Sequence, residues 1–387
     1  MELPKLFQSK KPFEFYEVKR LINKYPECKY YVIFGERSNG KTYSALSLAL
    51  ERYVELGEQF AYIRRFGLDI QKAQMETLFD GHAANGFIDK LTDGMYTGVD
   101  YTGRRFRLVN RTEESRKGNL DEKPCGWAFD LAAMERYKST SFPNVTTIIF
   151  DEFMSRTSYL PNEFTLFVNV LSTIIRNRSN VKVFLLGNTV NRYCPYFQEM
   201  GLSHVKEQQQ GTIDIYHYGQ SDLSVAVEYC ESSAKRGGKE SDVYFAFENP
   251  HLDMITSGGW ELAIYPRLPY GYQNKDVVES FFVSFTDDVL RGKLVQSKEG
   301  LYLVFYRYNK PIFNEDGSPV NQTEIIYAST HSIYDNVMFG LQNQDDNLSR
   351  IVRRLILKNK IFFDTNMSGE VLRNYLLWGA NADIRKN

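Results

Sequence analysis

The sequence predicts an α/β fold built on a three-layer parallel sheet, followed by a smaller α+β domain. For the first domain, the apolar run Tyr30–Phe34 leads through a turn, Gly35–Thr42, into a helical stretch, Tyr43–Leu50. Further apolar runs then alternate with amphipathic stretches to about residue 200. For the second domain, the apolar runs after residue 246 are mostly typical of strands. A chain of 387 residues also exceeds one ordinary domain.

Each element of the first domain has its own sequence signal. A short helix is expected up to about Tyr25, and Pro26 ends it. Runs rich in β-branched and aromatic residues predict buried strands, and apolar residues spaced for one face predict a helix. We expect strands at Gln59–Ile63, Trp127–Leu131, Thr146–Phe150 and Val181–Leu186, a β-hairpin within Met95–Val109 that turns at Gly98 or Gly103, and a helix at Glu163–Arg176.

A polar segment divides the chain. Residues 231–245 begin with small, polar and charged side chains, which predict a linker or mobile loop. The first domain is then expected at residues 1–230 and the second at residues 246–387. In the second domain we expect strands at Phe281–Phe285, Leu301–Tyr308 and Glu324–Ala328, and helices at Asn347–Lys358 and Ser368–Trp378.

The turn after the first apolar run matches the phosphate-binding loop at every fixed position. Its glycines let backbone N–H groups close around phosphate oxygens at a helix N-terminus. Lys41 is expected to reach the β- and γ-phosphates of ATP, and the Thr42 hydroxyl to take one Mg²⁺ position. An ordinary strand–helix turn is the alternative, but the flanking strand and helix favour nucleotide binding. The expected nucleotide-binding residues are Gly35, Arg37, Ser38, Asn39, Gly40, Lys41, Thr42, Tyr43 and Asn188.

Two adjacent acids, Asp151 and Glu152, directly follow a predicted buried strand, which we expect beside the loop strand. Asp151 can hold Mg²⁺ through water and Glu152 can polarise the attacking water, although a solvated pair of acids is the alternative. The second acid favours an ATPase over a small-molecule kinase. The long interval between Lys41 and Asp151 leaves room for extra strands. The expected class is therefore a P-loop NTPase of the additional-strand (ASCE) type, as in ring- and helicase-type ATPases.

Four further polar residues have more than one interpretation. Asn188, at the end of a predicted strand, can contact the γ-phosphate or the attacking water, or it can form a turn. Arg176 and Arg178 end the long helix, where they suit the helix dipole. They are also placed to reach a neighbouring subunit's nucleotide as an arginine finger. Arg37, inside the loop, can contact phosphates, signal between subunits or remain solvated.

Charge is nearly balanced, with 47 Lys and Arg against 48 Asp and Glu, so any contact with nucleic acid must be local. The candidate is the basic region around the predicted hairpin, whose side chains suit DNA phosphates or are simply solvated. The residues expected to contact DNA are Arg104, Arg105, Arg107 and Lys117. Four widely spaced cysteines argue against a zinc site or disulfide framework. The chain shows no signal-peptide core and no apolar run of membrane length, which predicts an intracellular protein without membrane contact.

The first half of the chain carries an ordered series of blocks, which covers roughly residues 30 to 200. They are Phe34–Tyr43, Gly57–Arg65, Gly103–Phe106, Gly126–Ala128, Phe142–Phe153, Tyr159–Glu163, Ile175–Arg178, Asn188 and Asn191–Phe197. In these blocks and their spacing the chain resembles the genome-packaging (encapsidation) ATPases of small short-tailed bacteriophages. Such a series is far more specific than a phosphate-binding loop alone.

The resemblance implies a homomeric ring, expected to be a pentamer, which docks on the portal of a prohead and drives double-stranded DNA inward by ATP hydrolysis. It places the protein in the host bacterial cytoplasm and, transiently, on the prohead vertex. The implied roles are phosphate and Mg²⁺ binding by Lys41 and Thr42, Mg²⁺ binding by Asp151, general base for Glu152, and a finger acting on a neighbouring subunit for Arg176. Lys138, which falls where the family carries an inter-subunit Lys, and Arg178 are further candidates for contacts between subunits.

In this family the second domain resembles a ribonuclease H-like nuclease that has lost its catalytic acids. Acids of this sequence such as Asp287, Asp288, Glu299 and Asp335 are scattered, whereas a two-metal nuclease needs several carboxylates at one site. We therefore expect a vestigial docking domain, where some relatives use a packaging RNA.

Three alternatives to the packaging motor stay open. They are a terminase-like motor with an active nuclease, a helicase-like translocase acting elsewhere, and a nucleotide-gated assembly protein with little turnover. The paired acids Asp151 and Glu152 argue against the last, because nucleotide binding alone needs no base.

Overall fold

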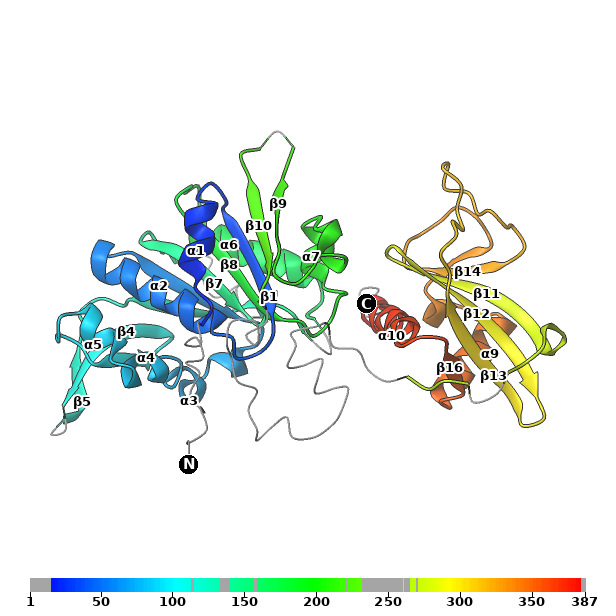
Figure 1. Cartoon of the computed structure of the whole chain (residues 1–387), viewed down its shortest axis with the longest axis horizontal. Coiled ribbons are helices and arrows are strands. Elements are labelled where there is room, and N and C mark those ends of the chain that lie inside the picture. Colours follow the sequence, from blue (N-terminus) through cyan, green and yellow to red (C-terminus); the bar gives the residue numbers. More distant parts are fainter. Residues whose placement is uncertain are drawn as a thin grey trace, which may run out of the picture. The chain divides into compact units, whose positions relative to one another are not determined.

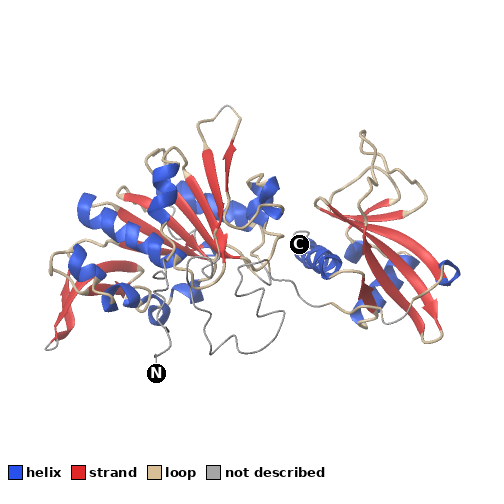
Figure 2. Cartoon of the chain, viewed as in Figure 1, coloured by secondary structure: helices blue, strands red, loops and turns tan. Residues whose placement is uncertain are grey.

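The computed structural model describes residues 15–112, 115–132, 140–155, 159–219, 221–231, 260, 265–268 and 271–383, without the side chains of 112, 115–117 and 381–383. The chain divides into two compact units, Met1–Glu261 and Leu262–Asn387 (Figures 1 and 2). The expected linker, residues 231–245, falls outside the described residues except for its first, so the domain limits stay a prediction. Among the described helices, none combines the length and apolar character needed to cross a membrane.

The first unit is built on a 10-stranded sheet with the order β3-β4-β6-β2-β7-β8-β1-β10-β9, and β5 pairs with β4. The central strands β6, β2, β7, β8, β1 and β10 run parallel, and antiparallel strands extend both edges. The strands are β1 (Tyr30–Gly35), β2 (Gln59–Arg64), β3 (Gly98–Thr102), β4 (Arg105–Thr112), β5 (Ser115–Leu120), β6 (Gly126–Asp130), β7 (Val145–Asp151), β8 (Lys182–Asn188), β9 (Ile213–His217) and β10 (Ser224–Tyr229).

Helices cover both faces of this sheet because successive strand residues point to opposite sides (Figure 2). Tyr31 and Ile33 of β1 pack in one apolar cluster with α1 and α2, whereas Val32 and Phe34 pack in another with α6 and α7. The predicted three-layer arrangement is therefore confirmed. The helices are α1 (Val18–Lys24), α2 (Lys41–Leu56), η1 (Gly67–Ile70), α3 (Lys72–Met75), α4 (Asp80–Ala84), α5 (Phe87–Leu91), α6 (Glu163–Ile175), α7 (Pro195–Glu199) and η3 (Ser203–Lys206).

One expectation about the sheet is wrong. The strand that ends in Asp151 does not lie beside the loop strand, because β8 pairs with both and separates them. This order is what an additional-strand P-loop domain requires, and it still brings the carboxyl ends of β1, β7 and β8 to one edge. The expected hairpin is present and turns at Gly103, while β9, β10 and the short helices between residues 67 and 91 were not anticipated.

The second unit contains a six-stranded sheet with the order β15-β14-β11-β12-β13-β16. β11, β12 and β13 are antiparallel neighbours, and β14, β15 and β16 join in parallel. Tyr327 bonds to Ser349 of α9, and Phe285 packs on Tyr375 of α10, so both helices cover the same face. The elements are η5 (Asn274–Asp276), β11 (Val277–Phe285), β12 (Asp288–Ser297), β13 (Gly300–Arg307), β14 (Ile325–Ala328), β15 (Val337–Phe339), η6 (Leu341–Asn343), α9 (Asn347–Leu357), β16 (Ile361–Phe363) and α10 (Asn366–Asp383). The α+β prediction is confirmed.

Candidate active site

The phosphate-binding loop connects β1 to α2 and holds a lysine at its centre. Gly40, with φ of 96°, and Ser38, with φ of 58°, adopt left-handed backbone that lets the chain curl before α2 begins. The buried Lys41 ammonium donates to Glu36 O at 2.6 Å, to Asn39 Oδ1 at 3.2 Å and to Asn188 Oδ1 at 3.4 Å. A cation held among oxygen acceptors inside a turn of backbone N–H groups is suited to bind phosphate.

Oxygen donors meet beside this lysine. The Thr42 hydroxyl donates to Asp151 Oδ1 at 3.1 Å, although the two residues belong to α2 and β7. Tyr62, from β2 and fully buried, donates to the other carboxylate oxygen of Asp151 at 2.8 Å. Burial, with Asp151 adding to it, raises the pKa of Tyr62, so its hydroxyl stays protonated and remains a donor. Hydroxyl and carboxylate oxygens are the ligands Mg²⁺ prefers, so Thr42 and Asp151 fit the expected metal site.

The second acid, Glu152, stands on strained backbone. Its φ is 56°, unusual for a residue with a side chain, and the side chain is 59% exposed. One carboxylate oxygen pairs with the guanidinium of Arg64, at the end of β2, at 2.5 Å. A carboxylate that is exposed beside Asp151 can accept a proton from water once it leaves this partner.

Lys41, Thr42, Asp151 and Glu152 line one pocket of about 280 Å³ at the carboxyl edge of the sheet. Its lining residues are Ser38, Asn39, Gly40, Lys41, Thr42, Tyr43, Asp151, Glu152, Leu186, Gly187 and Asn188. Gly35 and Arg37 do not line it. Gly187 was missed by the sequence reasoning. Any side chain there would come within 3 Å of Phe153 and Met154, so the close approach of β8 needs glycine.

Tyr43, which lines the pocket, contacts a histidine that no sequence motif indicated. The ring of His82, from α4, stacks on Tyr43 with 3.9 Å between centroids. His82 Nε2 lies 3.0 Å from Ser47 Oγ and 3.1 Å from Tyr43 O. Burial lowers the pKa of His82 to about 4. The helices between β2 and β3 thus support the first turn of α2 through an uncharged imidazole.

Arg176 and Arg178 lie at the opposite edge, where β7 begins. Arg178 donates all five guanidinium N–H bonds within its own chain, to the carbonyls of residues 142, 143, 145, 174 and 175. Direct contact between this group and a neighbouring subunit would require breaking these bonds. Arg176 is exposed, has φ of 43° and donates to Thr140 O at 2.8 Å. Beside it is a pocket of about 220 Å³.

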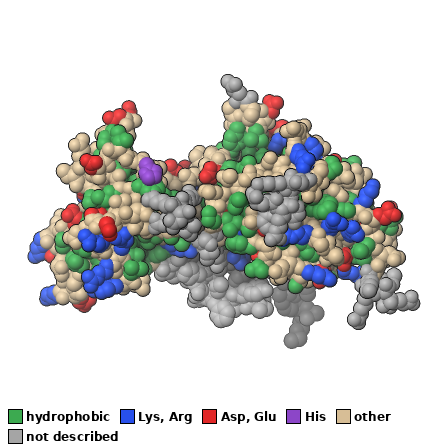
Figure 3. Space-filling view, turned by 180° about the vertical axis from the view of Figure 1, so that it is seen from behind, with side chains coloured by type: hydrophobic (Ala, Val, Ile, Leu, Met, Phe, Trp, Pro, Cys, Tyr) green, Lys and Arg blue, Asp and Glu red, His purple; other side chains and the backbone are tan. Residues whose placement is uncertain are grey.

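The remaining expected residues are engaged locally or are not described. Arg104 lies at the hairpin turn and pairs with Asp130 at 2.6 Å, and Arg105 lies over the Trp127 ring. Arg107 is the register partner of Asp100 on the neighbouring strand, but Asp100 forms its ion pair with Arg111, at 3.5 Å. The side chain of Lys117 and all of Lys138 lie outside the described residues. Lys and Arg side chains on the face in Figure 3 occur in separate groups with Asp and Glu among them. DNA contact at this hairpin stays a prediction.

Comparison of the chain with known proteins identifies its family. The model of the podovirus DNA encapsidation protein family (Gp16) matches residues 11–235. The DNA packaging proteins of Bacillus phages PZA and phi29 are each 32% identical over 186 residues, or 47% of this chain and 49% of theirs. The chain thus matches about half the length of these curated relatives. A chain in the structure of the bacteriophage phi29 viral genome packaging motor assembly is 22% identical to this chain and superimposes on it with a TM-score of 0.53. The match covers 96% of this chain and 99% of that chain, which shows a shared fold. More than half of the chain matches the family model, and the protein belongs to the podovirus DNA encapsidation protein family.

Proposed function

We propose that this chain is a ring-forming motor ATPase that moves double-stranded DNA into a preformed prohead. The observation that carries the enzymatic part is the convergence of Lys41, Thr42, Asp151 and Glu152 on one pocket. These residues come from two segments far apart in sequence, and each supplies a group that ATP hydrolysis needs. Family membership supports DNA as the cargo and the prohead as the destination.

Each residue has a separate role in the proposed reaction. Lys41 and the loop N–H groups bind and orient the phosphates, and the exposed Glu152 carboxylate takes the proton of the attacking water. Thr42 and Asp151 would hold Mg²⁺, which when bound supplies positive charge for the phosphate oxygens. Asn188, which accepts from Lys41, is placed to sense the phosphate that Lys41 binds.

The position of Arg176 supports the proposed ring. Its side chain lies at the edge where β7 and β8 begin, while its own phosphate loop lies at the edge where they end. An arginine finger at that place can act only on another subunit's nucleotide. We propose a homomeric ring, with five subunits expected, that docks on the phage portal in the host bacterial cytoplasm. A packaging RNA is a further candidate partner.

We propose that the second unit docks rather than cuts. Two of its carboxylates are each paired with an arginine, Asp288 with Arg307 at 3.0 Å and Glu324 with Arg291 at 2.7 Å. The described residues contain no group of three or more His, Cys, Asp or Glu side chains placed to hold a metal ion. A two-metal nuclease would need such a group.

A mixing experiment tests the shared site. ATP turnover is measured against protein concentration for the wild type, Arg176→Ala, Glu152→Gln and an equal mixture of the two variants. We expect wild-type turnover to rise steeply with concentration, both variants to be inactive, and the mixture to regain activity, because one subunit supplies the base and another the finger. Turnover per subunit that is independent of concentration, with no recovery on mixing, would contradict the ring.

A further inference from the structure

A buried arginine beside the active site has no part in the proposed reaction. Arg65 follows β2 directly, and its side chain is 8% exposed. Its Nε donates at 2.7 Å to Glu163, the first residue of α6, whose side chain is 1% exposed. Burying two charges is unfavourable unless their remaining hydrogen-bonding groups are also satisfied. The other contacts of both residues therefore indicate what the pair does.

Two further N–H groups of Arg65 hold the backbone of the catalytic segment. Nη1 donates to Glu152 O at 3.2 Å, and Nη2 donates to Phe153 O at 2.7 Å. These are the two carbonyls that follow Asp151, and between them they fix the direction in which the chain leaves β7. Glu152 has its unusual φ of 56° at this point. Such a conformation persists only where the surroundings impose it, and Arg65 supplies two directional bonds that do so.

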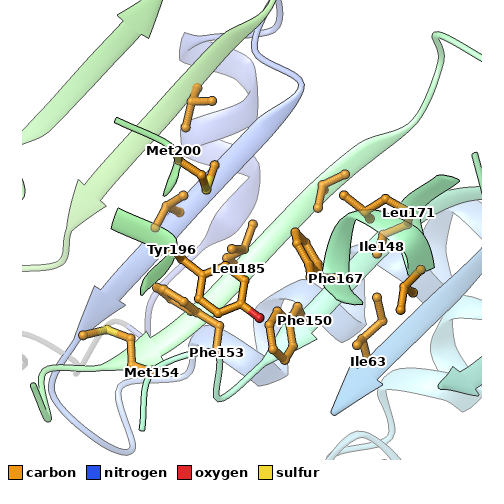
Figure 4. Packing of buried hydrophobic residues seen from close by; sticks show 14 of the residues in the cluster. Ile63, Ile148, Phe150, Phe153, Met154, Phe167, Leu171, Leu185, Tyr196 and Met200 are labelled. Carbon is orange, nitrogen blue, oxygen red and sulfur yellow. The ribbon is translucent and has the colours of Figure 1, made fainter. Parts of the chain in front are cut away.

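Glu163 is itself held from several sides, which makes it an anchor for Arg65. Its Oε1 accepts from the Tyr196 hydroxyl at 2.9 Å, and its Oε2 accepts from the Leu160 N–H at 2.7 Å. Tyr196 lies beside Phe150 and Phe153 in the apolar cluster on the α6 side of the sheet (Figure 4). The face of Tyr159 covers the guanidinium at 5.0 Å. This cluster ties the end of β2, the segment after β7, and the starts of α6 and α7 into one unit.

We propose that Arg65, anchored by Glu163, is a positioning residue that holds the Glu152 backbone in the orientation needed by the general base. The proposal rests on the proposed ATP hydrolysis for its kinetic consequence but not for its structural one. The planar guanidinium is essential, because its fork reaches a carboxylate and two carbonyls at once, whereas a lysine ammonium cannot present donors in that geometry.

The test compares Arg65→Lys with a matched change, Arg52→Lys, whose arginine pairs with Glu58 at the far end of α2. Two quantities are measured on the full chain: kcat and KM for ATP, and hydrogen exchange of the backbone amides of residues 152–155. For Arg65→Lys we expect kcat to fall about tenfold or more, KM to change less than twofold, and these amides to exchange faster. For Arg52→Lys we expect no change in either quantity.

A second pair of variants identifies the anchor. Glu163→Gln should lower kcat in the same way. The kcat of the double variant Arg65→Lys/Glu163→Gln should be little lower than that of the less active single variant, because both residues act through one contact. Where these variants reduce the amount of folded protein, Tyr196→Phe carries the test. It removes one bond to Glu163 without leaving a charge unpaired, and we expect a twofold to threefold loss of kcat with the same change in amide exchange.

Failure of the positioning role and failure of the proposed function are distinguishable. Unchanged exchange of residues 152–155 in folded Arg65→Lys, or an unchanged kcat beside faster exchange, overturns the positioning role. If the wild type does not hydrolyse ATP but Arg65→Lys still shows faster exchange, the proposed function is overturned. The conclusion that Arg65 holds the backbone at Glu152 and Phe153 then remains.

Discussion

The two sheets of this chain differ in how their charged residues are arranged. In the first unit, parallel strands end at one edge, where acids and cations from β2, α2 and the end of β7 meet around a pocket. In the second, central antiparallel strands run in alternate directions, and carboxylates such as Asp288 and Glu324 are each paired with an arginine. A parallel sheet collects chain segments with the same polarity, so chemistry can gather where they end. This comparison supports the assignment of the proposed ATP hydrolysis to the first unit.

The largest expected effect tests that assignment directly. Lys41→Ala removes the cation at the centre of the loop, so we expect ATP turnover to fall on the order of a hundredfold or more. Lys293→Ala is the control in the second unit, where Lys293 lies between the rings of Tyr272 and Tyr306. Steady-state turnover and binding of a fluorescent nucleotide measure both variants. Equal losses in the two would show that the chemistry is not confined to the first unit.

A difference in burial predicts the next effect. The Arg65–Glu163 pair has side-chain exposures of 8% and 1%, whereas Arg291–Glu324 has 34% and 22%. Glu163→Ala leaves a buried guanidinium unpaired, so we expect a loss of about 3–5 kcal/mol in the free energy of unfolding. Glu324→Ala should cost less than about 1 kcal/mol. Calorimetric unfolding of the full chain resolves the two, and comparable losses would mean that burial does not distinguish these pairs.

His82 predicts a pH dependence beside the nucleotide pocket. Burial lowers its pKa to about 4 in the folded chain, against about 6.5 when exposed. The unfolded chain therefore binds this proton first as pH falls, and the stabilisation present above pH 6.5 is lost towards pH 4, by at most about 3 kcal/mol.

His82→Phe retains an aromatic ring beside Tyr43 but cannot titrate. We expect the stability of this variant, measured by urea unfolding at a series of pH values, to fall less steeply between pH 6.5 and pH 4 than that of the wild type. Parallel curves would mean that His82 is already accessible to protons in the folded chain.

The smallest expected effect concerns the support of Asp151. Tyr62→Phe removes one hydrogen bond to its carboxylate, so we expect the Mg²⁺ concentration for half-maximal nucleotide binding to rise about threefold to tenfold. Tyr31→Phe makes the same change on β1, where the hydroxyl bonds to Tyr25 O, and should leave the Mg²⁺ titration unaltered. Superimposable titrations for Tyr62→Phe and the wild type would exclude this support.

Much of the first unit could be predicted because its signals are local. The apolar runs predicted β1, β2, β7 and β8 within one or two residues, and the loop pattern pointed to Lys41 and Thr42, which line the pocket. The order of the strands was harder, because pairing joins segments distant in sequence. The place of β8 between β1 and β7 depends on such pairing, and so does that of β10, which pairs with β1 almost 200 residues away.

The active-site residues outside the motifs could not be predicted, because they too depend on which strands pair. Tyr62 resembles any aromatic core residue until β2 is placed beside β7, when its hydroxyl meets Asp151. Arg64 and Arg65 did carry a signal, since two cations directly after a buried strand suggest partners at that edge. Their different roles were not readable, because Arg64 pairs with the Glu152 side chain while Arg65 holds its backbone. Arg178 looked like an ordinary charged residue at a helix end, but its guanidinium donates hydrogen bonds to backbone carbonyls.

The most direct test of the account compares Glu152→Gln with the wild type at saturating ATP and Mg²⁺, with nucleotide affinity measured alongside turnover. We predict that the variant binds ATP at least as well as the wild type, because Lys41, Thr42 and Asp151 are untouched. Its turnover should fall on the order of a hundredfold or more, because the amide cannot accept the proton from water and the remaining carboxylate, Asp151, is engaged by Thr42 and Tyr62. A Glu152→Gln variant that hydrolyses ATP at the wild-type rate would contradict the assignment of this edge of the first sheet as the hydrolytic site.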